Sequence, residues 1–400
     1  MMPQLHQKIL LFGLAFLLVL ATIFQANWFT SFPGGGWLYI ATVSISLPLF
    51  AWILGSFFSK KCRWLALVAL LFLEAGVAFS LHSVASGRQL PQSLTRLMKY
   101  VYGYHCRVNV AFQEGKGRYD ERLFYTLKPG SFEYSNLEFS TQFQVNSAGF
   151  RDDEASLKAP EIVFLGDSYG MGWGVEQGES YAEIVGERLG LRSLNAGIAS
   201  YGTAREWLAL QSFPLDSCQV VVIQFCVNDE AENRAFAANG FQLKVSPPAV
   251  YEDGVRWNEV SGSYFPFKYC HAVFAWALRK MEKEIARRTI QPGGEIIPPG
   301  GASQQGVAEF FAILEKMRAQ FKGEIIVFNL GETKTTHAVF EQFSAWLATH
   351  PMPGVHVFPT HEHVSTRSYF TLDDHLNSLG HKQLGEALAA FILKRKLLER

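Results

Sequence analysis

The sequence predicts an α/β protein: a three-layer α/β/α sandwich around a five-stranded parallel sheet, preceded by N-terminal transmembrane helices. Long apolar runs are confined to the first 82 residues. From Glu161 onward, short apolar runs alternate with amphipathic segments, the pattern of a parallel sheet with helices on both faces. These runs are rich in Val and Ile, as expected of strands buried on both faces. The five predicted strands are residues 162–165, 191–194, 219–225, 324–328 and 355–358.

Three apolar runs, at about residues 8–28, 37–58 and 64–82, predict three transmembrane helices that form a membrane anchor over residues 1–82. Each is close to the ~20 residues that a helix needs to cross a bilayer. The first lacks a good signal-peptide cleavage site and two more runs follow it, which favours a membrane span over a signal peptide. A buried core helix is the alternative for the third run.

The distribution of positive charge predicts how the chain is oriented. Lys8 precedes most of the first run, and Lys60, Lys61 and Arg63 lie between the second and third runs, whereas the loop at 25–36 carries no charge. Positive residues tend to stay on the cytoplasmic side. We therefore expect the chain beyond the third run, from about Ser83 onward, to lie on the extracytoplasmic side of the membrane.

Glu74 lies inside the third apolar run. A carboxylate within a membrane span is a functional-site hypothesis by default. The alternative is a Glu that is protonated or faces a partner helix in a small bundle, and this alternative is favoured.

The charge balance and the cysteines exclude some classes of protein. The chain has 36 basic and 36 acidic residues without a basic run, so no nucleic-acid partner is expected. No cofactor is expected either. Of the five cysteines, Cys106, Cys218, Cys226 and Cys270 would lie outside the cytoplasm, where disulfides persist, and Cys62 inside. Four cysteines allow three pairings, but Cys218 and Cys226 share a predicted strand and should not pair with each other.

Two segments fall outside the alternating pattern. Residues 83–160 predict a connector, and its alternating aromatic residues indicate short strands or a strap that lies on the following domain. Residues 161–400 form the predicted main domain, with an insertion at about 231–301 that is rich in Gly and Pro. An insertion after a strand commonly shapes a pocket, but a surface loop without a role is an equal alternative.

The helices of the main domain are predicted from apolar periodicity and from capping residues. Thr203 is a candidate N-cap, and so is Asn377 before the last helix. The predicted helices cover about residues 180–189, 203–213, 271–288 within the insertion, 305–321 and 377–398.

Polar or glycine residues follow three of the predicted strands where each strand ends. Ser168 follows the first strand, Gly197 the second and Asn228 the third, and Asp373 and His375 come just before the last helix. In a parallel sheet all of these would converge on one edge, where open α/β sheets bind their ligands.

These motifs resemble those of the SGNH (GDSL-type) hydrolase family. The residues that carry the resemblance occur in the family's order, each at a strand end or before the last helix: Gly166-Asp167-Ser168, Asn195-Ala196-Gly197, Val227-Asn228-Asp229 and Asp373-Asp374-His375-Leu376-Asn377. The resemblance covers roughly residue 161 to the C-terminus, without the insertion. It implies the flavodoxin-like fold of that family. The attachment to membrane spans is similar to that of many bacterial members, which implies a protein of the bacterial inner membrane with a periplasmic or extracellular domain.

The resemblance also implies a role for each motif residue. Ser168 would be the nucleophile, His375 the general base and Asp373 the acid that orients the histidine. The backbone N–H groups of Ser168 and Gly197 and the side-chain amide of Asn228 would form the oxyanion hole. A glycine suits the second position because the backbone must come close, and an amide suits the third because it donates without titrating.

Three alternatives concern these same residues. The identity of the acid is the first. The family's commoner spacing places the acid three residues before the histidine, but here that position is Leu372. Asp373 is therefore favoured as the acid, and Asp374 is the alternative. A metal site at the His and Asp residues is not favoured. Gly166-Asp167-Ser168-Tyr169-Gly170 also fits the G-x-S-x-G elbow of α/β-hydrolases, but only a short connector precedes it and its acid and histidine are nearly adjacent.

The predicted function is that of an extracytoplasmic serine esterase that acts through an acyl-enzyme. Its expected substrate is an acylated small molecule or glycan, above all an O-acetylated glycan or cell-envelope component. The alternatives are a lipid esterase or lysophospholipase, a glycan O-acyltransferase, and a non-catalytic envelope protein with a hydrolase-like fold. The oligomeric state stays open.

Overall fold

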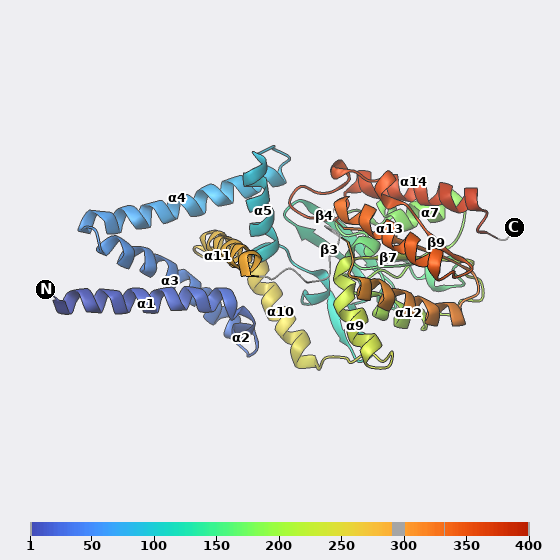
Figure 1. Ribbon diagram of the computed structural model, residues 1–400, viewed down its shortest axis with the longest axis horizontal. Helices are drawn as coiled ribbons and strands as arrows, with labels where there is room; N and C mark the ends of the chain where they lie inside the picture. Colours follow the sequence, from blue (N-terminus) through green and yellow to red (C-terminus); the bar gives the residue numbers. More distant parts are fainter. Residues whose placement is uncertain (1, 290–300, 332, 399–400) are drawn as a thin grey trace.

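The computed structural model describes residues 2–289, 301–331 and 333–398. Figure 1 shows an elongated molecule with three long N-terminal helices at one end and an α/β domain at the other. Three further helices lie between these two parts (Figure 1): α5 (Gln92–His105), α10 (Pro248–Gly262) and α11 (Lys268–Thr289).

The N-terminal part consists of α1 (Met2–Phe24), α3 (Gly35–Ser56) and α4 (Lys60–Ala85), with the short α2 (Ala26–Thr30) between α1 and α3. All three long helices are long and apolar enough to cross a membrane. Many of their large hydrophobic side chains are exposed, as expected of a surface that contacts lipid. The three predicted apolar helices are therefore confirmed, whereas the side of the membrane that the rest of the chain occupies stays a prediction.

Glu74, in the middle of α4, caps a neighbouring helix. Its carboxylate accepts hydrogen bonds from the backbone N–H groups of Tyr269 at 3.3 Å and Cys270 at 2.7 Å, in the first turn of α11. A carboxylate at this position satisfies donors that have no partner inside the helix and interacts favourably with the helix dipole. The structure confirms that Glu74 faces a partner helix.

The sheet has five parallel strands, as the sequence predicts, and their order is β6-β5-β7-β8-β9. The first strand, β5 (Ile162–Leu165), lies between β6 and β7, so that Ile162 pairs with both Ser193 and Val220. The remaining strands are β6 (Ser193–Asn195), β7 (Val220–Phe225), β8 (Glu324–Asn329) and β9 (Val355–Val357).

Helices cover both faces of this sheet and complete three layers. Alternate side chains of β5 point to opposite faces. Ile162 and Phe164 pack with α7 (Tyr181–Leu189) and α14 (Ser378–Arg395), whereas Val163 and Leu165 pack with the helices of the other face. Those helices are α8 (Thr203–Leu210), α12 (Gln304–Gln320) and α13 (Thr333–Thr349).

The connector contains one helix and two antiparallel hairpins. The helix is α5, which the sequence did not predict, and the hairpins agree with the predicted short strands. They are β1 (Gly117–Asp120) with β2 (Phe124–Leu127), and β3 (Gly130–Asn136) with β4 (Phe139–Val145). The second hairpin packs on the α/β domain through an edge contact between the rings of Tyr134 and Trp173.

The predicted insertion begins with α9 (Glu230–Ala238), which packs on the α/β domain, and continues with α10 and α11, which pack on the membrane-type helices. Arg256 of α10 donates to the carbonyl oxygen of Thr30 at 2.7 Å, and the imidazole of His271 in α11 lies 3.0 Å from the hydroxyl of Thr22 in α1. The predicted helix at 271–288 falls within α11, and residues 290–300 lie outside the described residues. The insertion therefore contacts both the α/β domain and the membrane-type helices.

All five cysteines are free thiols. Cys218 precedes β7 and Cys226 follows it, so they lie near opposite ends of the strand. This agrees with the expectation that they do not pair with each other.

Candidate active site

Ser168 lies at the carboxyl end of β5, where the chain turns into the short helix α6 (Ser168–Met171). Asp167 caps this helix, because its carboxylate accepts the backbone N–H of Tyr169 at 2.9 Å. Oε1 of Gln224 accepts the backbone N–H groups of Asp167 and Gly170, and it would lie 2.7 Å from a Cβ atom at Gly166, so the glycine leaves room for these hydrogen bonds. The buried strand and the capped turn therefore hold Ser168 in one place, with 9% of its surface exposed.

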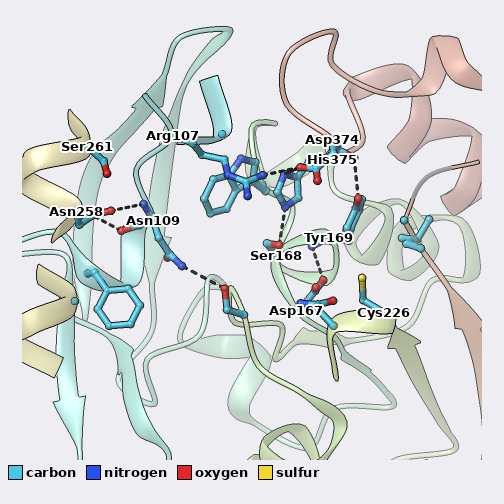
Figure 2. Close-up of a pocket in the computed structure, with 18 of the residues that line it drawn as sticks. Arg107, Asn109, Asp167, Ser168, Tyr169, Cys226, Asn258, Ser261, Asp374 and His375 are labelled. Atoms are coloured by element: carbon cyan, nitrogen blue, oxygen red, sulfur yellow. Dashed lines mark hydrogen bonds and ion pairs between the residues drawn. The ribbon is translucent and has the colours of Figure 1, made fainter. Parts of the chain in front are cut away.

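His375 joins Ser168 to an acidic side chain. Its Nε2 atom lies 2.6 Å from the hydroxyl oxygen of Ser168, and its Nδ1 atom is hydrogen-bonded to Oδ1 of Asp373. Figure 2 shows His375 directed at Ser168 above the cavity. The indole ring of Trp173 stacks on the imidazole with ring centres 4.7 Å apart, which restricts its rotation. The predicted Ser168, His375 and Asp373 are thus brought into one hydrogen-bonded chain.

The two candidate acids occupy different environments. Asp373 is fully buried, and its Oδ2 atom accepts hydrogen bonds from the hydroxyl of Tyr102 at 2.6 Å and the indole N–H of Trp173 at 3.2 Å. Burial opposes its ionisation, but the imidazole of His375 and its hydrogen bond, with Arg107 and Tyr102, hold the pKa of Asp373 well below its ordinary value. Asp374 is 59% exposed and pairs with Arg107 at 2.6 Å. Oδ1 of Asp374 also lies 3.5 Å from Nδ1 of His375, but the hydrogen bond of this nitrogen goes to Asp373, so the geometry favours Asp373 as the acid.

The loop that carries Asp373 is held by Glu138, which the sequence did not single out. Its carboxylate accepts the backbone N–H groups of Thr371, Leu372 and Asp373 at 2.9, 2.8 and 2.7 Å. Glu138 lies in the turn between β3 and β4, more than 200 positions away in sequence, so no local motif connects the two segments. Tyr102 and Arg107 were missed for the same reason.

The three predicted oxyanion donors do not meet at the cavity. Ser168 and Asn228 line it, and the Asn228 side chain is exposed there. Gly197 does not: its N–H donates to Oδ1 of Asn195 at 3.1 Å, and a Cβ atom on it would lie 2.4 Å from the backbone nitrogen of Met171. The glycine is therefore required by close packing under α6. Ser200 lines the cavity instead, with a positive φ of 63°.

The cavity beside Ser168 has a volume of about 620 Å³ and is closed on one side by α5 and α10. Asn258 of α10 accepts the backbone N–H of Asn109 at 2.7 Å, and the Asn109 side chain donates to the hydroxyl of Ser200 at 3.3 Å. Figure 2 shows Asn258 and Asn109 joined by dashed lines at one side of the cavity. Helix α10 itself contacts α2 and α3. Elements packed on the membrane-type helices thus form part of the cavity wall.

Asp373, Asp374 and His375 also place three possible metal-ligand atoms within 4.8 Å of one another. Both ring nitrogens of His375 are already engaged, one by Ser168 and one by Asp373. The guanidinium of Arg107 lies on the Asp374 carboxylate and 4.0 Å from that of Asp373. A cation is therefore already supplied by the protein, and the donor set does not favour a metal.

A group of buried carboxyls lies beneath the site. Asp167, Glu206 and Asp229 are each almost fully buried, and burial raises the pKa of Asp167 to about 6. Among the described residues, neither carboxyl oxygen of Glu206 has a hydrogen-bond partner. Burial, followed by the charges of Asp229 and Asp167, raises the pKa of Glu206 well above its ordinary value of 4.5.

Replacing Glu206 with Gln is expected to stabilise the protein more at pH 8 than at pH 5. A carboxyl with a raised pKa binds its proton more tightly in the folded state, so its cost to stability is absent below about pH 4.5 and grows as the pH rises toward the folded-state pKa. The amide removes this cost. We expect the Tm of the full chain to rise by roughly 2–4 °C more at pH 8 than at pH 5. Equal shifts at both pH values, or the same pattern in the exposed control Glu114→Gln, would contradict this.

No protein-family model matches the chain, and no curated protein matches it either. Among solved structures, it is similar to one described as a lipolytic protein of the G-D-S-L family from Desulfitobacterium hafniense DCB-2. The two share 12% sequence identity, and the likeness covers 57% of this chain and 97% of the other, with a TM-score of 0.32. At so low a TM-score the likeness does not support an assignment of function, which therefore depends on the residues of this chain.

The fold and its site together define a class of protein. The protein has a five-stranded parallel sheet between two layers of helices, and three apolar helices precede this domain in the sequence. A Ser, a His and an Asp are joined by hydrogen bonds at the carboxyl edge of the sheet. This architecture is consistent with the SGNH-like fold that the sequence motifs predict.

Proposed function

We propose that the protein is a membrane-associated serine ester hydrolase that acts through an acyl-enzyme on the extracytoplasmic side of the membrane. The observation that carries this proposal is the continuous hydrogen-bonded chain from the Ser168 hydroxyl through His375 to the buried Asp373. This chain opens onto a cavity large enough for a small substrate.

The geometry supports the following first step. An ionised Asp373 accepts the Nδ1–H of His375, which leaves Nε2 free to take the proton of the Ser168 hydroxyl. The Ser168 oxygen then bonds to the ester carbonyl carbon, and the carbonyl oxygen becomes an oxyanion. Asp373 stabilises the imidazolium that forms, and its buried hydrogen bonds to Tyr102 and Trp173 keep it in place.

Three donors are available for the oxyanion. Among the described residues, the backbone N–H groups of Ser168 and Ser200 and the side-chain amide of Asn228 have no recorded acceptor, and all three residues line the cavity. In this proposal Ser200 supplies the donor that was expected from Gly197. Preorganised donors of this kind commonly provide a factor of about 10²–10³ each.

The acyl group is then transferred to water. The His375 imidazolium returns its proton to the leaving alcohol as the ester C–O bond breaks, which leaves the acyl group on Ser168. A water molecule then gives a proton to His375 and attacks the acyl carbon, and the collapse of the second oxyanion releases the acid and restores the Ser168 hydroxyl.

The lining of the cavity supports a hydroxyl-rich alcohol, such as an O-acetylated glycan or envelope component. Asn109, Asn228, Asn258 and Ser261 all line it and offer neutral hydrogen-bonding groups. A lipid ester is the second candidate, because α5 and α10, which wall the cavity, pack on the membrane-type helices.

The test uses the purified full chain in neutral detergent with p-nitrophenyl acetate and p-nitrophenyl palmitate, beside Ser168→Ala. We expect ester hydrolysis that falls by at least about 10⁴-fold in Ser168→Ala, because the nucleophile is lost. Faster turnover of acetate supports the glycan deacetylase, and faster turnover of palmitate supports the lipid esterase. Hydrolysis of both esters at the same rate with and without the Ser168 hydroxyl would overturn the proposed function.

A further inference from the structure

A second cavity, of about 600 Å³, adjoins the one beside Ser168. The two cavities share Gly103, Arg107 and Asp374 as lining residues. Because Arg107 lies between them, a molecule whose ester reaches Ser168 can extend past this side chain into the second cavity, which we call the α5 groove.

One face of α5 forms one wall of this groove. Gln92, Arg96, Lys99 and Gly103 follow one another at helical spacings of three and four, so they lie on the same side of the helix. The opposite wall is aromatic and apolar, and comes from the segment that precedes Asp373: Tyr369, Phe370 and Leu372. The groove is therefore built by the helix next to the membrane part and by the loop that carries the acid.

The groove has an excess of positive charge. Arg96, Lys99 and Arg107 line it against a single carboxylate, that of Asp374, which is already paired with Arg107. Within the described part of the chain, no carboxylate forms an ion pair with Arg96 or Lys99, and both side chains are exposed. The cavity beside Ser168, by contrast, is lined by Arg107 and Asp374 as a neutral pair and by Asp167 at its floor.

We propose that the α5 groove binds a phosphate group of the ester substrate. A guanidinium offers a planar pair of donors that matches phosphate oxygens, and an ammonium adds a compact charge. This inference rests on the proposed function, because one substrate molecule would place its ester at Ser168 and its phosphate in the α5 groove, on the two sides of Arg107. It narrows the substrate to a phosphate-bearing ester.

Two sources would present the same chemistry. Helix α4 ends at Ala85 and α5 begins at Gln92, so the groove lies next to the end of a membrane-type helix, within reach of a lipid headgroup. A phosphorylated glycan of the cell envelope would carry the same group in water. The experiment below separates these sources.

The variant that tests the proposal is the double substitution Arg96→Gln/Lys99→Gln in the full chain in neutral detergent. Its substrates come in matched pairs: a 1-acylglycerol 3-phosphate with the corresponding monoacylglycerol, and an O-acetylated sugar phosphate with the same sugar without phosphate. We expect KM for a phosphate-bearing ester to rise roughly tenfold, since each exposed cation contributes a factor of up to about five. The kcat for that ester and both constants for the phosphate-free partner should stay unchanged.

A charge-matched control is Arg118→Gln/Lys128→Gln, which removes two exposed cations from the β1–β2 hairpin region, outside both cavities. An effect confined to the lipid pair identifies a headgroup, and an effect on the sugar pair identifies a phosphorylated glycan. Equal KM changes with and without phosphate, or an equal effect of the control variant, would overturn the proposal.

Binding of 1-acylglycerol 3-phosphate to Ser168→Ala, measured by titration calorimetry, keeps this inference separate from the proposed function. Weaker binding after the Arg96 and Lys99 substitutions supports the phosphate site even if Ser168 proves dispensable for hydrolysis. Unchanged binding, together with hydrolysis that depends on Ser168, refutes the phosphate site and leaves the esterase intact.

Discussion

Replacing Asp373 with Asn is expected to lower kcat for p-nitrophenyl acetate by about 10⁴-fold, whereas Asp374→Asn should cost less than about tenfold. Only Asp373 is buried and hydrogen-bonded to Nδ1 of His375. With an amide there, the imidazole loses the carboxylate that selects its tautomer and stabilises its cation. Asp374 is exposed to solvent and pairs with Arg107, so its loss changes the charge at the site without changing that tautomer.

The measurement compares kcat and KM of both variants with those of the unmodified full chain between pH 6 and pH 9. Circular dichroism and Tm of each variant are needed, because Asp373 accepts hydrogen bonds from Tyr102 and Trp173 inside the protein. Tyr102→Phe, which removes one of these bonds and keeps the carboxylate, serves as a comparison with a much smaller expected loss. A larger effect of Asp374→Asn than of Asp373→Asn would show that the assignment of the acid is wrong.

The second large effect is expected from removal of residues 1–85, which deletes α1 to α4. If these helices were only an anchor, the remaining chain would be a soluble and active enzyme. The structure predicts the opposite, because Val77, Leu81 and Val84 of α4 share one hydrophobic cluster with α5, α11 and Leu372. Leu372 adjoins Asp373, and Tyr102 of α5 donates to that carboxylate.

The deletion would expose apolar side chains such as Met98 and Val101 of α5, at a cost of about 2 kcal/mol each, and it would also uncover part of α11. A few such terms approach the 5–15 kcal/mol that stabilise a typical domain. We therefore expect the truncated chain to aggregate, or to fold with kcat/KM at least about 100-fold below that of the full chain, because the acid and the cavity wall lose their support. The measurement is soluble yield, Tm and p-nitrophenyl acetate hydrolysis, and a monomeric truncated chain with unchanged kcat/KM would contradict the expectation.

Much of the fold follows from local patterns. The apolar run at Ile162–Leu165 is a strand with the same bounds in the structure, and the last strand and the sheet's parallel alternation agree closely with expectation. Three long apolar runs became three long apolar helices. These features depend on the periodicity and hydrophobicity of short segments, which the sequence displays directly.

The candidate site was predictable where it depends on strand ends. Ser168, Asn228 and His375 follow buried strands or precede a helix, and in a parallel sheet such positions converge. The proposed second oxyanion donor was not predictable in the same way, since several small residues follow β6 in the sequence. Which of them reaches the cavity depends on the path of the turn, and the structure places Gly197 under α6 and Ser200 at the cavity.

The sequence by itself therefore determined the sheet, the membrane-type helices and the identity of the Ser and His. Only the tertiary structure decided which aspartate faces the histidine, that Glu138 holds the acid loop, and that α5 and α10 wall the cavity while packing on the membrane-type helices. The physical reason is that the side chains that bury and bind these groups come from distant parts of the chain: Tyr102, Arg107 and Glu138 each lie more than 200 positions from the aspartates that they contact. Their energy comes from burial and from charge pairing between surfaces, which no periodicity within either segment records.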